Sequence, residues 1–248
     1  VTPYKEKKMP NASTSFFGWV AFLLQKYGML FLRGTGVTLL IALTGTALGF
    51  ALGLLVAIIR TIALPEKKKA GSNAGVIVKR GLLRFVHMLM NVYIQVFRGT
   101  PMIVQAVVIY YGAQYAGVFM DTTFAAVFII SINTGAYMAE IIRGGIVSVD
   151  KGQFEAAHAI GMTHWQTMTT VVLPQAIRNI LPSVGNELIV NIKDSSVLNV
   201  ISVSELFFQA KSAAGTYYRY FEVYFIIAVI YLILTLTVSR ILRAVEKK

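Results

Sequence analysis

Residues 154–174 read FEAAHAIGMTHWQTMTTVVLP, and their interpretation decides the topology of the whole chain. From 156 to 177 there is no Asp, Glu, Lys or Arg, so a hydropathy window would accept this segment as a membrane span. It is nevertheless rich in Thr, His and Gln, carries Gly161 in its first third and reaches Pro174. We therefore predict a short helix, a stop at Gly161 and a second, weakly amphipathic piece that Pro174 ends, rather than a spanning helix.

The composition is that of a membrane protein. Of 248 residues 56% are hydrophobic and 14% are charged, whereas soluble domains average about 25% charged. The net charge of +12 does not indicate nucleic acid, because the basic residues cluster beside hydrophobic runs instead of forming one stripe. The chain has no cysteine, which excludes disulfides, thiolate metal sites and a cysteine nucleophile.

The hydrophobic pattern predicts an all-α integral membrane protein with one transmembrane domain over residues 1–248. Residues 15–32 are too short for a span and fit an N-terminal interfacial helix. A long loop over 143–177 contains the opening stretch. The five expected spans cover 34–59, 84–117, 122–142, 178–200 and 222–242.

The basic residues predict the orientation of these spans. The three segments that would be cytoplasmic hold 14 Lys and Arg, and the three external ones hold seven. By the positive-inside rule the N-terminus is outside and the C-terminus inside. Five of the seven external cations lie in the first 33 residues, against the rule, and an interfacial helix that holds Lys26 and Arg33 at the headgroups reduces this conflict.

Two glycine-containing patterns mark close packing and a break. Gly45, Gly49 and Gly53 recur every fourth residue and line one helix face, which favours packing between helices of one subunit over a pathway. Within the second hydrophobic region, FRGTP at 97–101 predicts a broken helix, which a membrane tolerates only where protein or a water-filled cavity covers it.

Catalysis has little support in the residues. The three histidines are His87, His158 and His164, and none belongs to an HExxH or similar metal-ligand pattern. The sequence contains no GxSxG elbow and no GxxxxGK[ST] loop. We therefore expect no catalytic and no metal-ligating residue in this chain.

Charged residues at spanning depth are the stronger functional candidates, because such charges tend to face a bundle interior or a cavity. Glu140 and Arg143 are three residues apart on one helix face, which favours a structural ion pair. Lys193 and Asp194 point in different directions, so Asp194 either lines a substrate cavity or is satisfied within the bundle. The full set of charged candidates is Arg98, Glu140, Arg143, Glu187, Lys193 and Asp194.

The short helix in the opening stretch has a small apolar face. Ala156, Ala159 and Ile160 share that face by i, i+3, i+4 spacing. Such a face fits a groove in another protein, or it lies on the chain's own bundle. Glu155 in the first turn favours the helix dipole and is available to a basic partner residue.

The motif EAAHAIG…LPQA resembles the EAA loop of bacterial ABC importer permeases, through Glu155, Ala156, Ala157, Gly161, Leu173 and Pro174. Further stretches are similar to the subfamily for polar amino acids (histidine, glutamine or arginine type). They are RGTGVTLLIAL at 33–43, VFRGTPMIVQ at 96–105, AYMAEIIRGGI at 136–146 and IKDSSVLNVISVSEL at 192–206. The basic stretch 65–79 is longer than this family leads us to expect.

This resemblance implies the type I ABC importer fold and a bacterial inner-membrane assembly. Two permease subunits, identical or paralogous, would pair, and an external binding protein would deliver the substrate. Two ATPase subunits, which bind the ATP and Mg²⁺, would dock on the short helix of the EAA loop, the cytoplasmic coupling helix. The docking residues would be Glu155, Ala156, Ala157, Ala159 and Gly161.

The expected function is that of a permease subunit, not an enzyme, that moves a polar or charged amino acid inward by alternating access. Alternatives are a permease for a related solute such as an opine or cystine, a stand-alone secondary transporter, or a scaffold without transport. The residues expected to line the substrate path are Arg98, Thr100, Gln105, Tyr110, Glu187, Asp194, Ser195 and Ser196.

Overall fold

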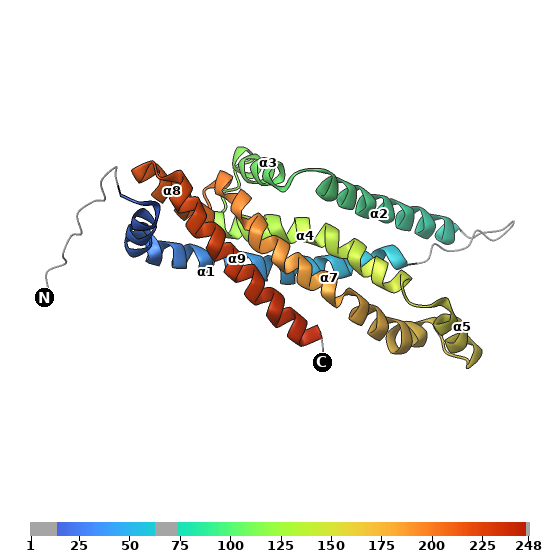
Figure 1. Cartoon of the computed structure of the whole chain (residues 1–248). Helices are drawn as coiled ribbons and strands as arrows, with labels where there is room; N and C mark the ends of the chain where they lie inside the picture. The colour runs from blue at the N-terminus through green and yellow to red at the C-terminus, as the bar shows by residue number, and fades with distance from the viewer. Residues whose placement is uncertain (1–13, 63–73, 247–248) are drawn as a thin grey trace, which may run out of the picture.

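A computed structural model describes residues 14–62 and 74–246, and this part of the chain is helical throughout. The long helices form an elongated bundle, with α5 at one end and α8 beside the first turns of α1 at the other (Figure 1). Residues 63–73, most of the unexpectedly basic stretch, lie outside the described ranges. The elements are α1 (Phe16–Thr61), α2 (Ala74–Gly99), α3 (Met102–Tyr115), α4 (Thr122–Val147), α5 (Lys151–Ala159), α6 (His164–Gln166), the π-helix η1 (Thr167–Val172), α7 (Leu173–Asp194), the 3-10 helix η2 (Ser195–Ile201), α8 (Leu206–Tyr217) and α9 (Tyr220–Glu246).

Helix α1 corrects one prediction. The expected interfacial helix over 15–32 is not separate, because the chain continues without a break from Phe16 to Thr61. Forty-six residues extend about 69 Å, so α1 is much longer than a bilayer's hydrocarbon core. The glycine at the expected boundary permits packing instead of a break, since a Cβ on Gly34 would lie 2.9 Å from the Leu206 Cα of α8.

The predicted glycine face is confirmed as a packing surface within the subunit. A Cβ on Gly45 would lie 2.5 Å from the side chain of Ile130, and one on Gly49 would lie 2.7 Å from that of Thr134. One on Gly53 would lie 2.4 Å from Met138 Cβ. All three contacts are with α4, so the absent side chains let the α1 and α4 backbones approach closely.

A buried polar triad joins α7 to this pair of helices. The Asn191 side-chain nitrogen donates to the hydroxyls of Thr46 at 2.8 Å and Thr134 at 2.9 Å. All three side chains are buried. Because each polar group has a partner, the triad can hold three helices together inside an apolar core.

The opening stretch forms a short helix α5 followed by a second piece, as predicted, but Pro174 does not end that piece. Residues 164–194 form one helical run through α6, η1 and α7, and Pro174 lies in the first turn of α7. A proline there removes an N–H that has no regular α-helical partner, because the preceding turns are π-helical.

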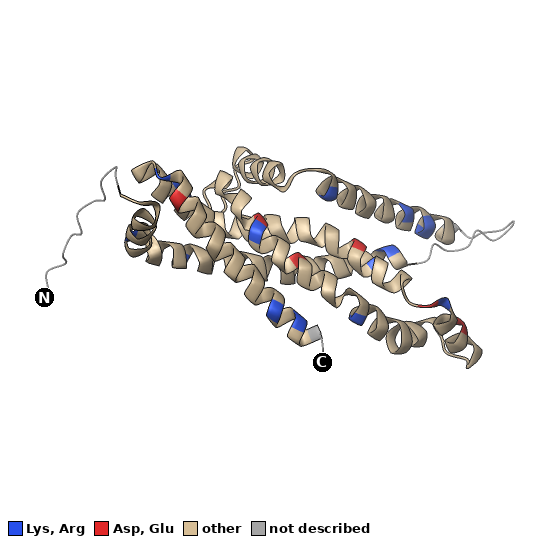
Figure 2. Ribbon diagram, in the orientation of Figure 1, with Lys and Arg blue, Asp and Glu red and all other residues tan. Residues whose placement is uncertain are grey.

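Hydropathy supports several membrane crossings in the described ranges. Phe16–Thr61, Thr122–Val147 and Tyr220–Val245 are each long and apolar enough, and α2 with α3 would add one more as a span bent by 114°. Long stretches of the bundle carry no charged residue (Figure 2). Helix α7 fails this test of composition, so the count of five spans and their limits stay predictions.

Candidate functional site

Helix α5 is exposed at one end of the bundle (Figure 1). Asp150 begins it, because its carboxylate accepts the N–H of Gly152 at 2.6 Å. Glu155, Ala156 and Ala159 are exposed. The exit at Gly161 has a φ of +80°, a backbone conformation that glycine adopts without strain.

The opposite side of α5 holds it to the base of the bundle. Ala157 is only 4% exposed, so of the expected docking residues it faces its own chain. Phe154 packs against a cluster formed by Val149, Val172 and Ala176. The helix therefore has one face fixed on η1 and on its neighbours Val149 and Ala176, and one small apolar face available.

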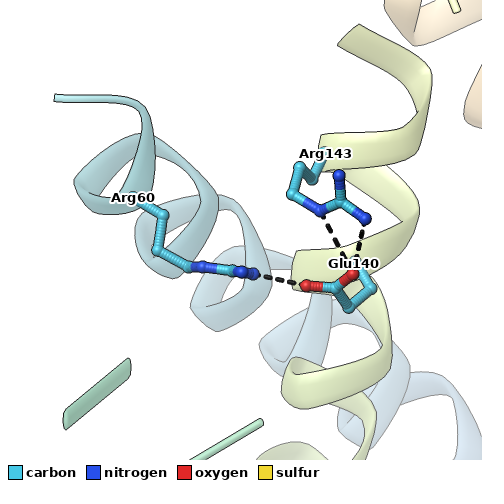
Figure 3. A network of polar contacts seen from close by, with 3 residues as sticks. All are labelled: Arg60, Glu140 and Arg143. Carbon is cyan, nitrogen blue, oxygen red and sulfur yellow. Dashed lines mark hydrogen bonds and ion pairs between the residues drawn. The ribbon is translucent and has the colours of Figure 1, made fainter. Parts of the chain in front are cut away.

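Near this end, a three-residue ion network joins α1 to α4 (Figure 3). The Arg143 guanidinium donates to Glu140 Oε2 through Nε at 3.1 Å and Nη2 at 2.9 Å, which confirms the predicted pair. Arg60 of α1 bonds the other carboxylate oxygen. Sequence reasoning missed Arg60, because 80 residues separate it from Glu140.

Farther along the same face of α4, Arg98 at the end of α2 lies beside polar residues of α4 and α7. Its guanidinium carbon is 5.4 Å from the ring centre of Tyr137 in α4. Glu187 of α7 interacts electrostatically with both Arg98 and Asp194. Glu187 and Asp194 are half-buried and Arg98 is exposed. The structure thus brings three of the expected substrate-lining residues to one face.

Polar residues continue along the exposed surface of the same two helices. Asn91 and Gln95 precede Arg98 at i, i+4 and i+7 on α2, and both are exposed. On α7, Asn186 is exposed one residue before the half-buried Glu187. Polar side chains at spanning depth are costly against lipid, so this face requires a water-filled path or another subunit over it.

The remaining expected lining residues make contacts within the chain. Thr100 donates to the Val96 carbonyl at 2.8 Å, and the Gln105 amide bonds backbone carbonyls of the α2–α3 corner. Tyr110 packs on the core between α1, α3 and α4. Ser195 is buried and donates to the Ile192 carbonyl at 3.0 Å.

Ser196 lies apart from the Arg98 face. It lines a hollow of about 330 Å³ between α7, η2, α8 and α9 together with Lys193 and the aromatic rings of Phe207, Tyr224 and Tyr231. The pattern IKDSS therefore divides between two surfaces. Asp194 interacts with the Arg98 group, whereas Lys193 and Ser196 face the hollow.

Sequence reasoning also missed Asn133 and Tyr137, which hold the α2–α3 corner from α4. A usable pattern was present, because the two are four residues apart and so lie one turn apart on one face of the helix.

Residues 71–248 match the family model described as "Binding-protein-dependent transport system inner membrane component". The chain is 39% identical over 221 residues to the glutamine transport system permease protein GlnP of Escherichia coli (strain K12), covering 88% of this chain and 92% of that protein. It is 35% identical over 218 residues to the arginine transport system permease protein ArtQ of Bacillus subtilis (strain 168), covering 88% and 91%.

The fold is similar to a solved structure titled "Crystal structure of an amino acid ABC transporter with histidines". The TM-score is 0.79 at 38% identity, over 95% of this chain and 99% of that one. The methionine transporter MetNI in an inward-facing conformation gives a TM-score of 0.67 at 21% identity, covering 90% and 97%, which is a likeness of fold alone.

Proposed function

Because the chain belongs to the family of binding-protein-dependent transport system inner membrane components, we propose that it is the permease subunit of an ATP-driven importer for a polar or charged amino acid. The observation that carries this function is the pairing of a fixed docking helix, α5, with a polar face at spanning depth on the same chain. Glutamine and arginine are the first substrates to test, from the names of the relatives.

The exposed face of α5 is the proposed docking surface for an ATPase subunit. Ala156, Ala159 and Ile160 present small apolar groups to a groove, and Ile160 is 79% exposed. The other side of α5 is packed on η1, which continues into α7, so a push on α5 is transmitted to that helical run. ATP and Mg²⁺ would be bound by the ATPase partners, whose cycle would rock the bundle between its two access states.

Adjacent lysine substitutions on α5 test this docking. Ala159→Lys and Glu155→Lys place a cation on the docking face, and we expect either to abolish copurification of the ATPase and ATP-driven uptake. Thr169→Lys adds a cation at an exposed position of η1, outside α5, and should keep both. Equal copurification in all three variants would refute docking through α5.

The substrate path is proposed along the face formed by Arg98, Glu187 and Asp194. Arg98 would bind the α-carboxylate of an amino acid, and Asp194 its ammonium group. A second permease subunit, identical or paralogous, would cover the polar stripes of α2 and α7 and so close the path against lipid. Asp194→Ala should then reduce uptake and substrate-stimulated ATP hydrolysis; unchanged activity would remove Asp194 from the site.

Two measurements separate this function from its alternatives. Uptake into vesicles should require ATP on the α5 side together with the ATPase, whereas uptake by this chain alone under an ion gradient would indicate a secondary transporter. Single introduced cysteines test the proposed orientation, because the chain has no cysteine of its own. An impermeant reagent outside cells should label Phe17→Cys and spare Ile160→Cys, both at exposed positions.

A further inference from the structure

The corner between α2 and α3 leaves the Phe97 carbonyl without its helical partner. Helix α2 ends at Gly99, α3 begins at Met102, and the two axes differ by 114°. In a continuous helix the Phe97 carbonyl would accept the N–H four residues on. Residue 101 is Pro101, which has no N–H. An unpaired carbonyl at spanning depth costs several kcal/mol, so another donor must replace it.

Two side-chain amides supply that donor. Gln105 Nε2 donates to the carbonyls of Phe97 and Thr100, both at 2.9 Å. Asn133 Nδ2 of α4 donates to Gln105 Oε1 at 2.8 Å and reaches the Phe97 carbonyl at 3.3 Å. Gln105 is only 6% exposed. We call Gln105 and Asn133 the amide clamp; it replaces the missing helical bond and ties the corner to α4.

The same face of α4 also holds the side chain that follows Phe97. Asn133 and Tyr137 are four residues apart, so they lie one above the other on α4. Asn133 contacts the Phe97 carbonyl, and Tyr137 places its ring 5.4 Å from the Arg98 guanidinium. The backbone at the corner and the arginine next to it are therefore held by consecutive turns of one helix.

We propose that the amide clamp positions Arg98 for the amino acid, and that Gln105 acts through Arg98 without touching the substrate. This inference rests on the proposed function, because it assigns Arg98 to the carboxylate of the transported amino acid. The Gln105 amide nitrogen has three acceptors within hydrogen-bond distance, the Phe97 and Thr100 carbonyls and the Thr100 hydroxyl, and the amide oxygen accepts from Asn133. Replacing Gln105 by leucine leaves the Phe97 carbonyl with only the longer bond from Asn133 and removes the donor to the Thr100 carbonyl, so we expect the corner to rearrange and Arg98 to move with it.

Cysteine reactivity tests the positioning without any substrate. The chain contains no cysteine, so Arg98→Cys provides a single thiol whose modification rate by a soluble methanethiosulfonate reports the geometry of the corner. Adding Gln105→Leu should change this rate several-fold. The matched control is Gln175→Leu, which removes an amide that donates to the Val171 carbonyl at 2.9 Å near the α5 end of the bundle; its effect should stay within about twofold. Equal rates with and without Gln105→Leu would overturn the clamp.

A binding cycle tests whether the clamp acts through Arg98. Labelled L-glutamine or L-arginine is bound to the purified permease–ATPase complex without its external binding protein, and Kd is measured for Arg98→Ala, Gln105→Leu and the double variant. Each single change should raise Kd, and the double variant should match Arg98→Ala within about twofold. If the fold-increase in Kd of the double variant instead equals the product of the two single increases, Gln105 is an independent substrate contact and the positioning role is refuted.

The two arms separate failure of the inference from failure of the proposed function. If the unmodified complex binds no amino acid and shows no ATP-driven uptake, the proposed function fails, and the thiol reactivity still decides whether the clamp holds the corner. If the complex transports the amino acid and the Kd increases of the single variants multiply in the double variant, the proposed function stands and only the role given to Gln105 is wrong.

Discussion

Replacing Gly53 by alanine should separate α1 from α4 and destabilise the bundle. The added Cβ would lie 2.4 Å from Met138 Cβ, 2.8 Å from the Ala139 nitrogen and 2.9 Å from the Gly135 oxygen. Two of these three atoms are backbone, so no rotation of a side chain can relieve the overlap. The Met138 Cβ is also fixed by its backbone, so to reach an ordinary contact of 3.4 Å from 2.4 Å the two helices must move apart by about 1.0 Å.

The expected loss follows from two opposing effects. Overpacking of a well-packed interface costs about 1–3 kcal/mol, and alanine recovers about 0.5–1 kcal/mol of helix propensity relative to glycine. At the middle of each range the net loss is about 1.3 kcal/mol, which for a chain of this size lowers Tm by about 3–5 °C.

Two other glycines of α1 provide graded controls. At Gly45 the nearest atoms belong to the Ile130 side chain, and the nearest backbone atom is 3.9 Å away, so Gly45→Ala should cost less. At Gly36 nothing lies within 4 Å, so Gly36→Ala should be neutral or slightly stabilising. Thermal unfolding of the purified protein in one detergent measures all three. A Tm for Gly53→Ala as high as that for Gly36→Ala would refute the close-packing argument.

Three further predictions concern charges and a turn. Glu140→Gln leaves Arg60 and Arg143 without their shared acid, so it should lower the free energy of unfolding by about 1 kcal/mol more than Arg143→Gln does, and Tm with it. Equal losses in the two variants would contradict the network. At the start of α4, N–H bonds from Phe124 and Thr123 lower the pKa of Asp121, so its stabilising effect is present above the unfolded pKa and is lost as pH falls through the folded pKa, below about pH 4. Asp121→Asn keeps the cap without titrating and should flatten the acid side of a Tm–pH profile; an unchanged profile would remove Asp121 from it. Gly161→Ala places a side chain at a φ of +80°, which costs about 1–2 kcal/mol and should weaken ATPase copurification, whereas Gly144→Ala, with nothing near its Cβ, should not.

The sequence was sufficient where neighbours along the chain decide the structure. Glu140 and Arg143 pair because they are one turn apart, and α5 ends where a glycine permits a positive φ. The glycine face of α1 was also predictable, since a period of four residues places small side chains on one line. Each of these features depends on spacing within one helix, which the residue order specifies directly.

Features that join distant segments were not accessible in the same way. Arg60 completes the Glu140 network from another helix, and no spacing rule connects positions 60 and 140. Helix α1 continues through Gly34 because α8 packs closely against it there, so this glycine allows a close helix contact and does not end the helix. In both cases the partner lies on a distant segment of the chain. The local sequence pattern therefore identified the type of residue but could not predict what it contacts.

The placement of Gln105 shows how a polar residue at spanning depth can be assigned more carefully. Such a residue has either a ligand or a backbone group to satisfy, and the two cases look identical in a hydrophobic run. A proline that breaks the helix supplies the missing information, because it orphans the carbonyl four residues earlier, here that of Phe97. Donor side chains nearby should be assigned to that carbonyl first, and the structure assigns it Gln105 and Asn133. The side chains of Arg98, Glu187 and Asp194 do not hydrogen-bond the Phe97 carbonyl, and this is why they are the stronger candidates for binding the substrate.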